Sequence, residues 1–188
     1  MTTTIRRFAI CAGHDQRDPG NTAGGHREAD LMLELRDLLS ESLRARGCEV
    51  VNDGPTGANR PLIEAVTLVR NVDLAVELHT NAGANPQATG VEIISLFPMR
   101  AQAQALARAI ANVLSIPLRR DAGWYDGTLH GMDRGWSRPA AFVRAGGLIV
   151  ETFFQSNPQE LARYLVRRDA LIEALTNVLV PMSDGSAP

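Results

Sequence analysis

Apolar residues along the chain form two kinds of pattern, short continuous runs and longer stretches with helical spacing. Short runs bounded by turn residues predict buried strands, at residues 5–12, 48–53, 73–79, 89–97, 140–145 and 147–153. Helical spacing predicts helices at residues 30–46, 59–71, 98–114 and 158–179. Strands that alternate with helices are typical of α/β domains. We therefore expect a single three-layer domain with a twisted, mostly parallel central sheet of about six strands, flanked by helices.

Two of the predicted helices carry clear boundary signals. Gly47 follows the leucine-rich first helix and is expected to end it. In the last helix Asn157 stands at the N-cap position, Pro158 in the first turn and Glu160 at the third helical position, which is the arrangement of a capping box. We expect one domain over residues 1–181 and a flexible tail over residues 182–188.

Two long segments lack either periodicity and are predicted to be loops. Residues 13–29 are rich in Gly, Asp, Asn and His, and residues 117–139 contain several glycines. A loop of this length inside a compact domain is usually functional. The second loop holds Trp124, Tyr125 and Trp136, which either contact a ligand or attach the loop to the core.

Composition and charge narrow the class of protein. An apolar content of 45% and a charged content of 21% are typical of a globular domain. The net charge of −2 gives no general attraction to nucleic acid or to a membrane surface. The apolar runs are too short for a membrane span or a secretory signal. We therefore expect a monomer that is made in the cytoplasm without a signal peptide, binds no nucleic acid and does not insert stably into membranes.

Four ionisable residues lie where the predicted strands end. His14 follows the first strand, His79 ends the third, Glu151 lies near the end of the last, and Glu28 precedes the first helix. Ligands of open α/β sheets bind beyond the carboxyl ends of the strands, so we expect these side chains at one edge. Two imidazoles and a carboxylate suit zinc, with a fourth position left for water. A second carboxylate in apolar surroundings, where its pKa is raised, can act as a general base.

Each of these residues also has a structural interpretation. A histidine at a strand end is often simply hydrogen-bonded, Glu28 near a helix start complements the helix dipole, and Glu151 could be a satisfied core carboxylate. His26, two residues before Glu28, is the chief alternative metal ligand. Ordinary structural roles are expected for His130, Glu77 and Glu92.

Three motifs, in this order, resemble a known family. They read AGHDQRDPGNTAGGHREADLMLELRDLL, VELHTNAG and LIVETFFQSNPQELARYL. Over about residues 5–180, the chain resembles the catalytic domain of the zinc-dependent N-acetylmuramoyl-L-alanine amidases of type 3, the AmiC/CwlV/LytC kind. The resemblance implies that His14, Glu28 and His79 bind Zn²⁺ and that Glu151 is the catalytic carboxylate.

The chain departs from the family pattern at three places. The family usually has Asp-Pro-Gly-His-Gly where this chain has residues 11–15, Cys-Ala-Gly-His-Asp. Phe153 stands where a glycine is common, and Gly147 where a proline is often found. None of these differences removes a residue implied to bind metal.

The resemblance implies a peptidoglycan hydrolase that cleaves the amide bond between N-acetylmuramic acid and the L-alanine of the stem peptide by attack of a zinc-activated water. The alternatives are a zinc peptidase of the same fold acting on another peptide substrate, and an inactive wall-binding module. We expect action on the cell wall, as a phage endolysin released into the periplasm or wall, or else as a secreted autolysin domain.

Contacts to this substrate are expected from four residues. Asn81 either orients a ligand or caps a turn, and Arg144 either meets a peptide carboxylate or forms a structural ion pair. Trp124 and Trp136 are the candidates for stacking on the sugar.

Overall fold

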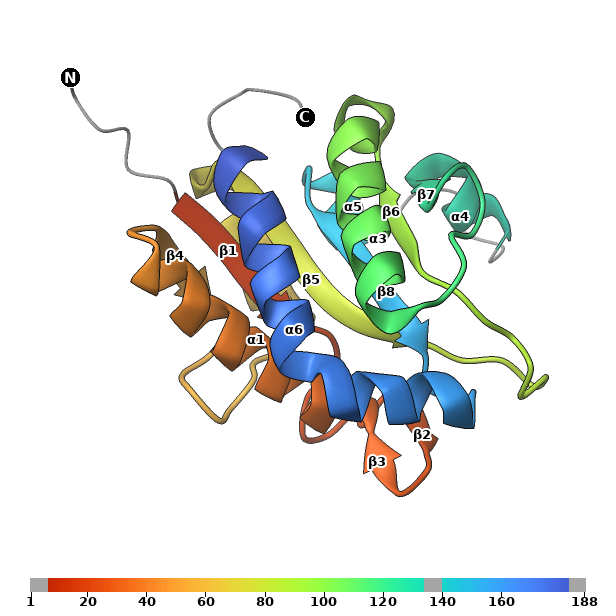
Figure 1. Ribbon diagram of the computed structural model, residues 1–188. Helices are drawn as coiled ribbons and strands as arrows, with labels where there is room; N and C mark the ends of the chain where they lie inside the picture. Colours follow the sequence, from red (N-terminus) through yellow and green to blue (C-terminus); the bar gives the residue numbers. More distant parts are fainter. Residues whose placement is uncertain (1–6, 134–139, 183–188) are drawn as a thin grey trace.

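The computed structural model describes residues 7–133 and 140–182 of the chain. Within this part, six strands form one sheet (Figure 1) in the order β4-β1-β5-β8-β6-β7. The strands span Arg7–Ala12 (β1), Glu49–Asn52 (β4), Leu74–Asn81 (β5), Glu92–Ser95 (β6), Trp124–Asp126 (β7) and Leu148–Phe154 (β8). All neighbours pair in parallel except β6 and β8, so the predicted mostly parallel sheet is confirmed.

Helices cover both faces of this sheet, as expected for three layers. They span Glu28–Ala45 (α1), Leu62–Leu68 (α2), Arg100–Leu114 (α3), Gly127–Asp133 (α4), Ala141–Arg144 (α5) and Pro158–Met182 (α6). Short 3-10 turns at Val69–Asn71 and Phe97–Met99 adjoin α2 and α3, and a small hairpin of Thr22–Ala23 (β2) and His26–Arg27 (β3) precedes α1. No helix among the described residues is long and apolar enough to cross a membrane.

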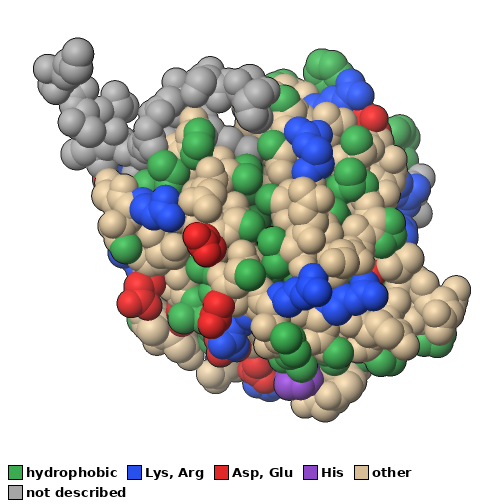
Figure 2. Space-filling view, viewed as in Figure 1, with side chains coloured by type: hydrophobic (Ala, Val, Ile, Leu, Met, Phe, Trp, Pro, Cys, Tyr) green, Lys and Arg blue, Asp and Glu red, His purple; other side chains and the backbone are tan. Residues whose placement is uncertain are grey.

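The two faces of the sheet are covered unequally. Helices α1, α3 and α6 lie side by side over one face (Figure 1) and share the larger hydrophobic cluster with it. Arginine and acidic side chains are interspersed over the outer surface of this helical layer (Figure 2). The smaller cluster on the other face includes residues of α2 and α5. The second face is therefore the one with room for a cavity.

Alternation along β5 places polar groups on the thinly covered face. Val76 and Leu78 belong to the larger cluster, and the residues between and after them, Glu77 and His79, point to the opposite side. His79 pairs in parallel register with Glu151 of β8, so these two side chains share one face. The pattern that forms the core thus also delivers the candidate site residues to the second face.

Two segments differ from the sequence prediction. Residues 140–145 were expected to form a strand, but α5 forms there. Gly146 has a positive φ of 108° and ends α5, while Gly147 leaves room for Phe142, whose ring lies 2.2 Å from the Cβ that any other residue would carry. The sixth strand is instead β7, which together with α4 lies inside the segment 117–139 predicted as a loop.

Of the capping box predicted at the start of α6, the Asn157 cap is confirmed and the reciprocal contact of Glu160 is not. The side-chain oxygen of Asn157 accepts hydrogen bonds from the backbone N–H groups of Gln159 and Glu160, at 3.0 and 3.3 Å. The buried Glu160 carboxylate is used elsewhere. It accepts from the N–H of Gly90 at 2.8 Å, the N–H of Phe154 at 2.7 Å and the hydroxyl of Thr89. Glu160 therefore ties the entrance of β6 to the end of β8.

Replacing Glu160 by alanine should lower the free energy of unfolding by about 3 kcal/mol, because two buried N–H groups lose their acceptor. Urea unfolding measures this change. The exposed Glu173 on the same helix is the matched control, and its alanine variant should stay within about 0.5 kcal/mol of the original. Equal effects at the two positions would contradict the structural role of Glu160.

Candidate metal centre and active site

A cavity of about 470 Å³ opens on the thinly covered face, toward the carboxyl ends of the central strands. The four ionisable residues expected at one edge all line it, namely His14, Glu28, His79 and Glu151. Of the described residues, His14, Glu28 and His79 form the group of possible metal ligands, with one ligand atom from each lying within 4.8 Å of the others. The fold therefore brings together residues that lie far apart in the sequence.

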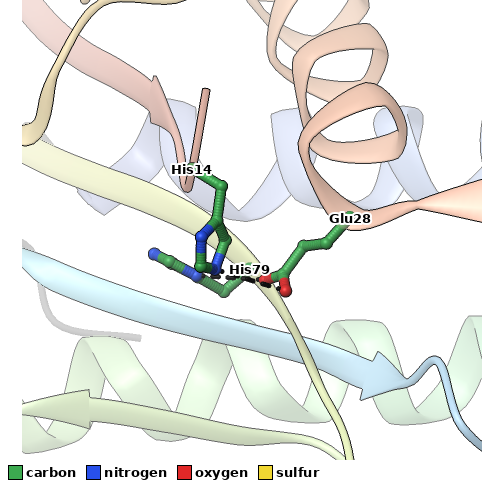
Figure 3. Close-up of side chains that lie close together, drawn as sticks. All are labelled: His14, Glu28 and His79. Carbon is green, nitrogen blue, oxygen red and sulfur yellow. Dashed lines mark hydrogen bonds and ion pairs between the residues drawn. The ribbon is translucent and has the colours of Figure 1, made fainter. Parts of the chain in front are cut away.

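Glu28 interacts with both histidines of this group (Figure 3). It is the first residue of α1 and is 1% exposed. One carboxylate oxygen lies 3.1 Å from Nδ1 of His79, and the other lies 3.3 Å from Nε2 of His14. The backbone N–H groups of Thr80 and Asn21 also donate to it, at 2.8 and 2.9 Å. The carboxylate is thus fixed between the two imidazoles.

A second carboxylate holds each histidine on its other side. Nδ1 of His14 lies 3.0 Å from Asp18, and Nε2 of His79 lies 3.4 Å from Glu77. The two rings meet edge to face with centroids 5.2 Å apart. An imidazole with one nitrogen directed into a site and the other directed to a carboxylate is typical of metal-binding histidines. Asp18 was not singled out from the sequence, and Glu77 was expected to have an ordinary structural role, because only the folded chain places these carboxylates against the two rings.

The pKa shifts show a site adapted to positive charge. Burial alone would raise the pKa of Glu28, but hydrogen bonds with His14 and His79 hold its pKa well below the ordinary value. The hydrogen bond to Glu28 is the main cause of the raised pKa of His14. Burial would lower the pKa of His79, yet hydrogen bonds to Glu28 and Glu77 raise it well above the usual value. A cation at this point is therefore favoured by the surrounding carboxylates.

These donors fit zinc. Two imidazoles and one carboxylate from three separate elements are the ligand set of many catalytic zinc sites, and they leave a position open for water or substrate. His26, the alternative ligand, is not in the group, and its backbone carbonyl accepts a hydrogen bond from Gln155 at 2.8 Å.

Two glycines make room for the ligands. A Cβ on Gly13 would lie 2.1 Å from Cε1 of His79. Gly20 has a positive φ of 65°, and a Cβ there would lie 2.5 Å from the His14 ring and 2.6 Å from Glu28. Both positions therefore require glycine for the ligands to converge.

Replacing Gly13 by alanine should weaken zinc binding at least ~10-fold, since the His79 ring must leave its place between Glu28 and Glu77. Competition with a chromophoric chelator measures the zinc affinity. Gly83→Ala is the matched control, because its Cβ would meet Ala88 at an ordinary 3.5 Å. If Gly13→Ala binds zinc as Gly83→Ala does, the close approach is not needed for the site.

The residues expected to contact substrate lie in different places. Asn81 lines the cavity and donates to Glu92 at 2.8 Å. Arg144 is exposed on α5 and is not among the residues that line the cavity. Trp124 is buried in the larger hydrophobic cluster, where its Nε1 donates to Ser95 at 3.0 Å. Trp136 lies outside the described residues.

The cavity wall also includes a histidine that was expected to have an ordinary structural role. His130, on α4, is 7% exposed, lines the cavity, and meets the Tyr125 ring edge to face at 5.3 Å. The sequence contained no signal for this placement, because α4 was predicted as part of a loop.

Comparison with known proteins gives one consistent family. The profile of the N-acetylmuramoyl-L-alanine amidases matches residues 8–178. No curated protein sequence matches this chain. A structure from Neisseria meningitidis, described as an N-acetylmuramoyl-L-alanine amidase, is 34% identical, with a TM-score of 0.84 and 97% of both chains covered.

More distant structures share the fold. The N-acetylmuramoyl-L-alanine amidase from Clostridium difficile 630 is 21% identical, with a TM-score of 0.75 and coverage of 97% of this chain and 98% of that one. The catalytic domain of CwlV from Bacillus (Paenibacillus) polymyxa var. colistinus is 17% identical, with a TM-score of 0.74 and coverage of 96% and 99%. Profile, fold and cavity agree, and the chain belongs to the type 3 family of N-acetylmuramoyl-L-alanine amidases.

Proposed function

We propose that the chain hydrolyses the amide bond between N-acetylmuramic acid and the L-alanine of the peptidoglycan stem peptide, with Zn²⁺ held by His14, Glu28 and His79. The observation that carries this proposal is the buried Glu28 carboxylate, placed between two imidazoles in the wall of a cavity. Family membership supplies the bond that is cleaved. Zinc bound there would act as a Lewis acid on the scissile carbonyl and on the attacking water.

Glu151 is the proposed general base. It pairs with His79 across neighbouring parallel strands, which lie about 4.8 Å apart, so its side chain stands beside the metal group. It lines the cavity and, among the described residues, is not part of the metal-binding group. Glu151 would take the proton of the attacking water and donate it to the departing amine of L-alanine.

Asn81 is the proposed substrate contact that the cavity supports best. It follows His79 by two residues on β5, on the same face of the sheet, and lines the cavity. Glu92, 5% exposed, accepts from the Asn81 amide and is held in turn by Arg119 at 3.0 Å. This chain of contacts fixes the orientation of Asn81, whose side-chain oxygen accepts a hydrogen bond from the backbone N–H of Ala82 at 3.0 Å.

Purified muropeptides, incubated with the chain and analysed by mass spectrometry, test the proposal. The expected products are intact stem peptides with a free N-terminal L-alanine, and a chelator should prevent their release. Cleavage within the stem peptide would favour the zinc peptidase, and no cleavage despite bound zinc would favour the wall-binding module. Trp136 and Arg144 remain predictions for substrate contact, which single alanine variants in the same assay would test.

A further inference from the structure

The segment between β4 and α2 contacts the backbone that carries His14. The side-chain amide of Asn59, in this segment, donates to the carbonyl of Ala12 at 2.7 Å and to the carbonyl of His14 at 2.6 Å. One amide group therefore spans the turn by which the chain leaves β1 and reaches the first metal-binding histidine.

This turn has a conformation that needs support. His14 has a positive φ of 65°, in the left-handed region that residues with a Cβ rarely adopt. The neighbouring Gly13 is closely packed against the His79 ring, so the turn cannot relax toward β5. Such backbone geometry persists where surrounding contacts determine it. The two hydrogen bonds from Asn59 are contacts of this kind.

Asn59 is itself held from α1. Nη1 of Arg36 lies 3.3 Å from the side-chain oxygen of Asn59, which leaves the amide nitrogen to face β1. Arg36 is fully buried. Its guanidinium also donates hydrogen bonds to the side chains of Asp37 and Asp53 and to the backbone carbonyls of Pro55 and Ala58. Asp53 also accepts from the N–H of Ala12 at 3.2 Å.

Helix α1 is thus connected to two of the proposed metal ligands, Glu28 and His14. Glu28 is the first residue of α1, and Arg36 lies about two turns further along the same helix. The first ligand is placed by the helix directly. The second, His14, is placed through Arg36, Asn59 and the backbone of the turn.

We propose that Asn59 is a positioning residue of the metal centre, whose amide holds the backbone of Ala12 and His14 so that the His14 imidazole meets Glu28 and His79. This inference rests on the proposed function, since it assumes that His14 is a zinc ligand. Residues that orient metal ligands typically contribute 10–100-fold to metal affinity. Loss of the Asn59 amide should therefore weaken zinc binding by at least ~10-fold.

The chain offers a matched control in Asn52, at the end of β4. Its amide nitrogen donates to the carbonyl of Ile10 on β1 at 2.8 Å, and its oxygen accepts from Arg44 of α1 at 2.8 Å. Asn52 and Asn59 therefore make the same kind of bridge from α1 to β1. They differ in position, because Ile10 lies within the strand and His14 lies beyond its end, and in the second donor bond, which Asn52 makes to the hydroxyl of Ser40 at 2.8 Å.

The test compares Asn59→Asp with Asn52→Asp. Each substitution keeps the size of the side chain and removes the amide donor. Zinc affinity is measured by competition with a chromophoric chelator, and stability by urea unfolding of the zinc-free protein. We expect both variants to be less stable, but only Asn59→Asp to bind zinc at least ~10-fold more weakly. Asn59→Ala, which adds no charge near Asp53, should show the same loss of affinity and replaces the aspartate variant if that one does not fold.

Other outcomes overturn the inference. Unchanged zinc affinity in both Asn59 variants would show that the turn holds His14 without the amide. An equal loss of affinity in Asn52→Asp would show that general destabilisation, and not the position of His14, is the cause. A wild-type chain that binds no zinc would remove the metal centre itself, which distinguishes failure of the proposed function from failure of the role of Asn59.

Discussion

Replacing Glu151 by glutamine is expected to lower turnover ~10²–10⁴-fold while zinc stays bound, because glutamine keeps the shape of the side chain and cannot accept a proton. Steady-state hydrolysis of purified muropeptides at saturating zinc measures the turnover, and chelator competition measures the affinity. The position of Glu151 beside His79, outside the group of three ligands, is the physical reason for expecting these two readouts to separate.

Glu77→Gln is the matched control for this prediction. Glu77 lies on the same face of the sheet, two residues before His79, and faces its Nε2 at 3.4 Å. Its loss should weaken zinc affinity ~10-fold and have much less effect on turnover once zinc is saturating. Near-normal turnover in Glu151→Gln, or loss of its zinc, would reject Glu151 as the base.

Replacing His79 by alanine is expected to abolish both high-affinity zinc binding and hydrolysis, since one of three ligands is removed. It should also remove the stabilisation that zinc gives. At a free zinc concentration of 100 times Kd, the wild-type fold gains about 2.7 kcal/mol. For a domain of this size that corresponds to a rise in Tm of about 5–10 °C.

Thermal unfolding with zinc and with chelator measures this difference. Wild type should show the rise in Tm, and His79→Ala should unfold at the same temperature under both conditions. Far-UV circular dichroism confirms that the variant is folded. A zinc-dependent rise of normal size in His79→Ala would contradict the ligand assignment.

The sequence predicted the strands and helices of the sheet best where apolar periodicity is long. It was wrong at residues 140–145, because a short apolar run looks the same in a buried strand and in a single helical turn. Strand β7 was missed because its local sequence does not show the apolar pattern of a strand. Its three residues, Trp124–Asp126, lie among glycines, and only the packing of Trp124 in the core indicates that this segment joins the sheet.

For the site, the sequence predicted the groups that lie at strand and helix ends. The topology of an α/β sheet brings such ends to one edge, so His14, Glu28, His79 and Glu151 could be grouped without coordinates. The supporting residues Asp18 and Asn59 could not, because each acts through a contact made by a loop. Loop conformation depends on tertiary packing, which periodicity does not report.

The bonds around Glu28 have a consequence for how the proposed metal centre gains and loses its ion. The donors are fixed by backbone N–H groups and by Asp18 and Glu77, so the scaffold is preorganised and need not fold around the ion. Small zinc-dependent domains, in contrast, unfold when the ion is withdrawn. The apo-protein should therefore keep its native backbone and regain full activity on reloading, with the ion exchanging reversibly through the cavity mouth.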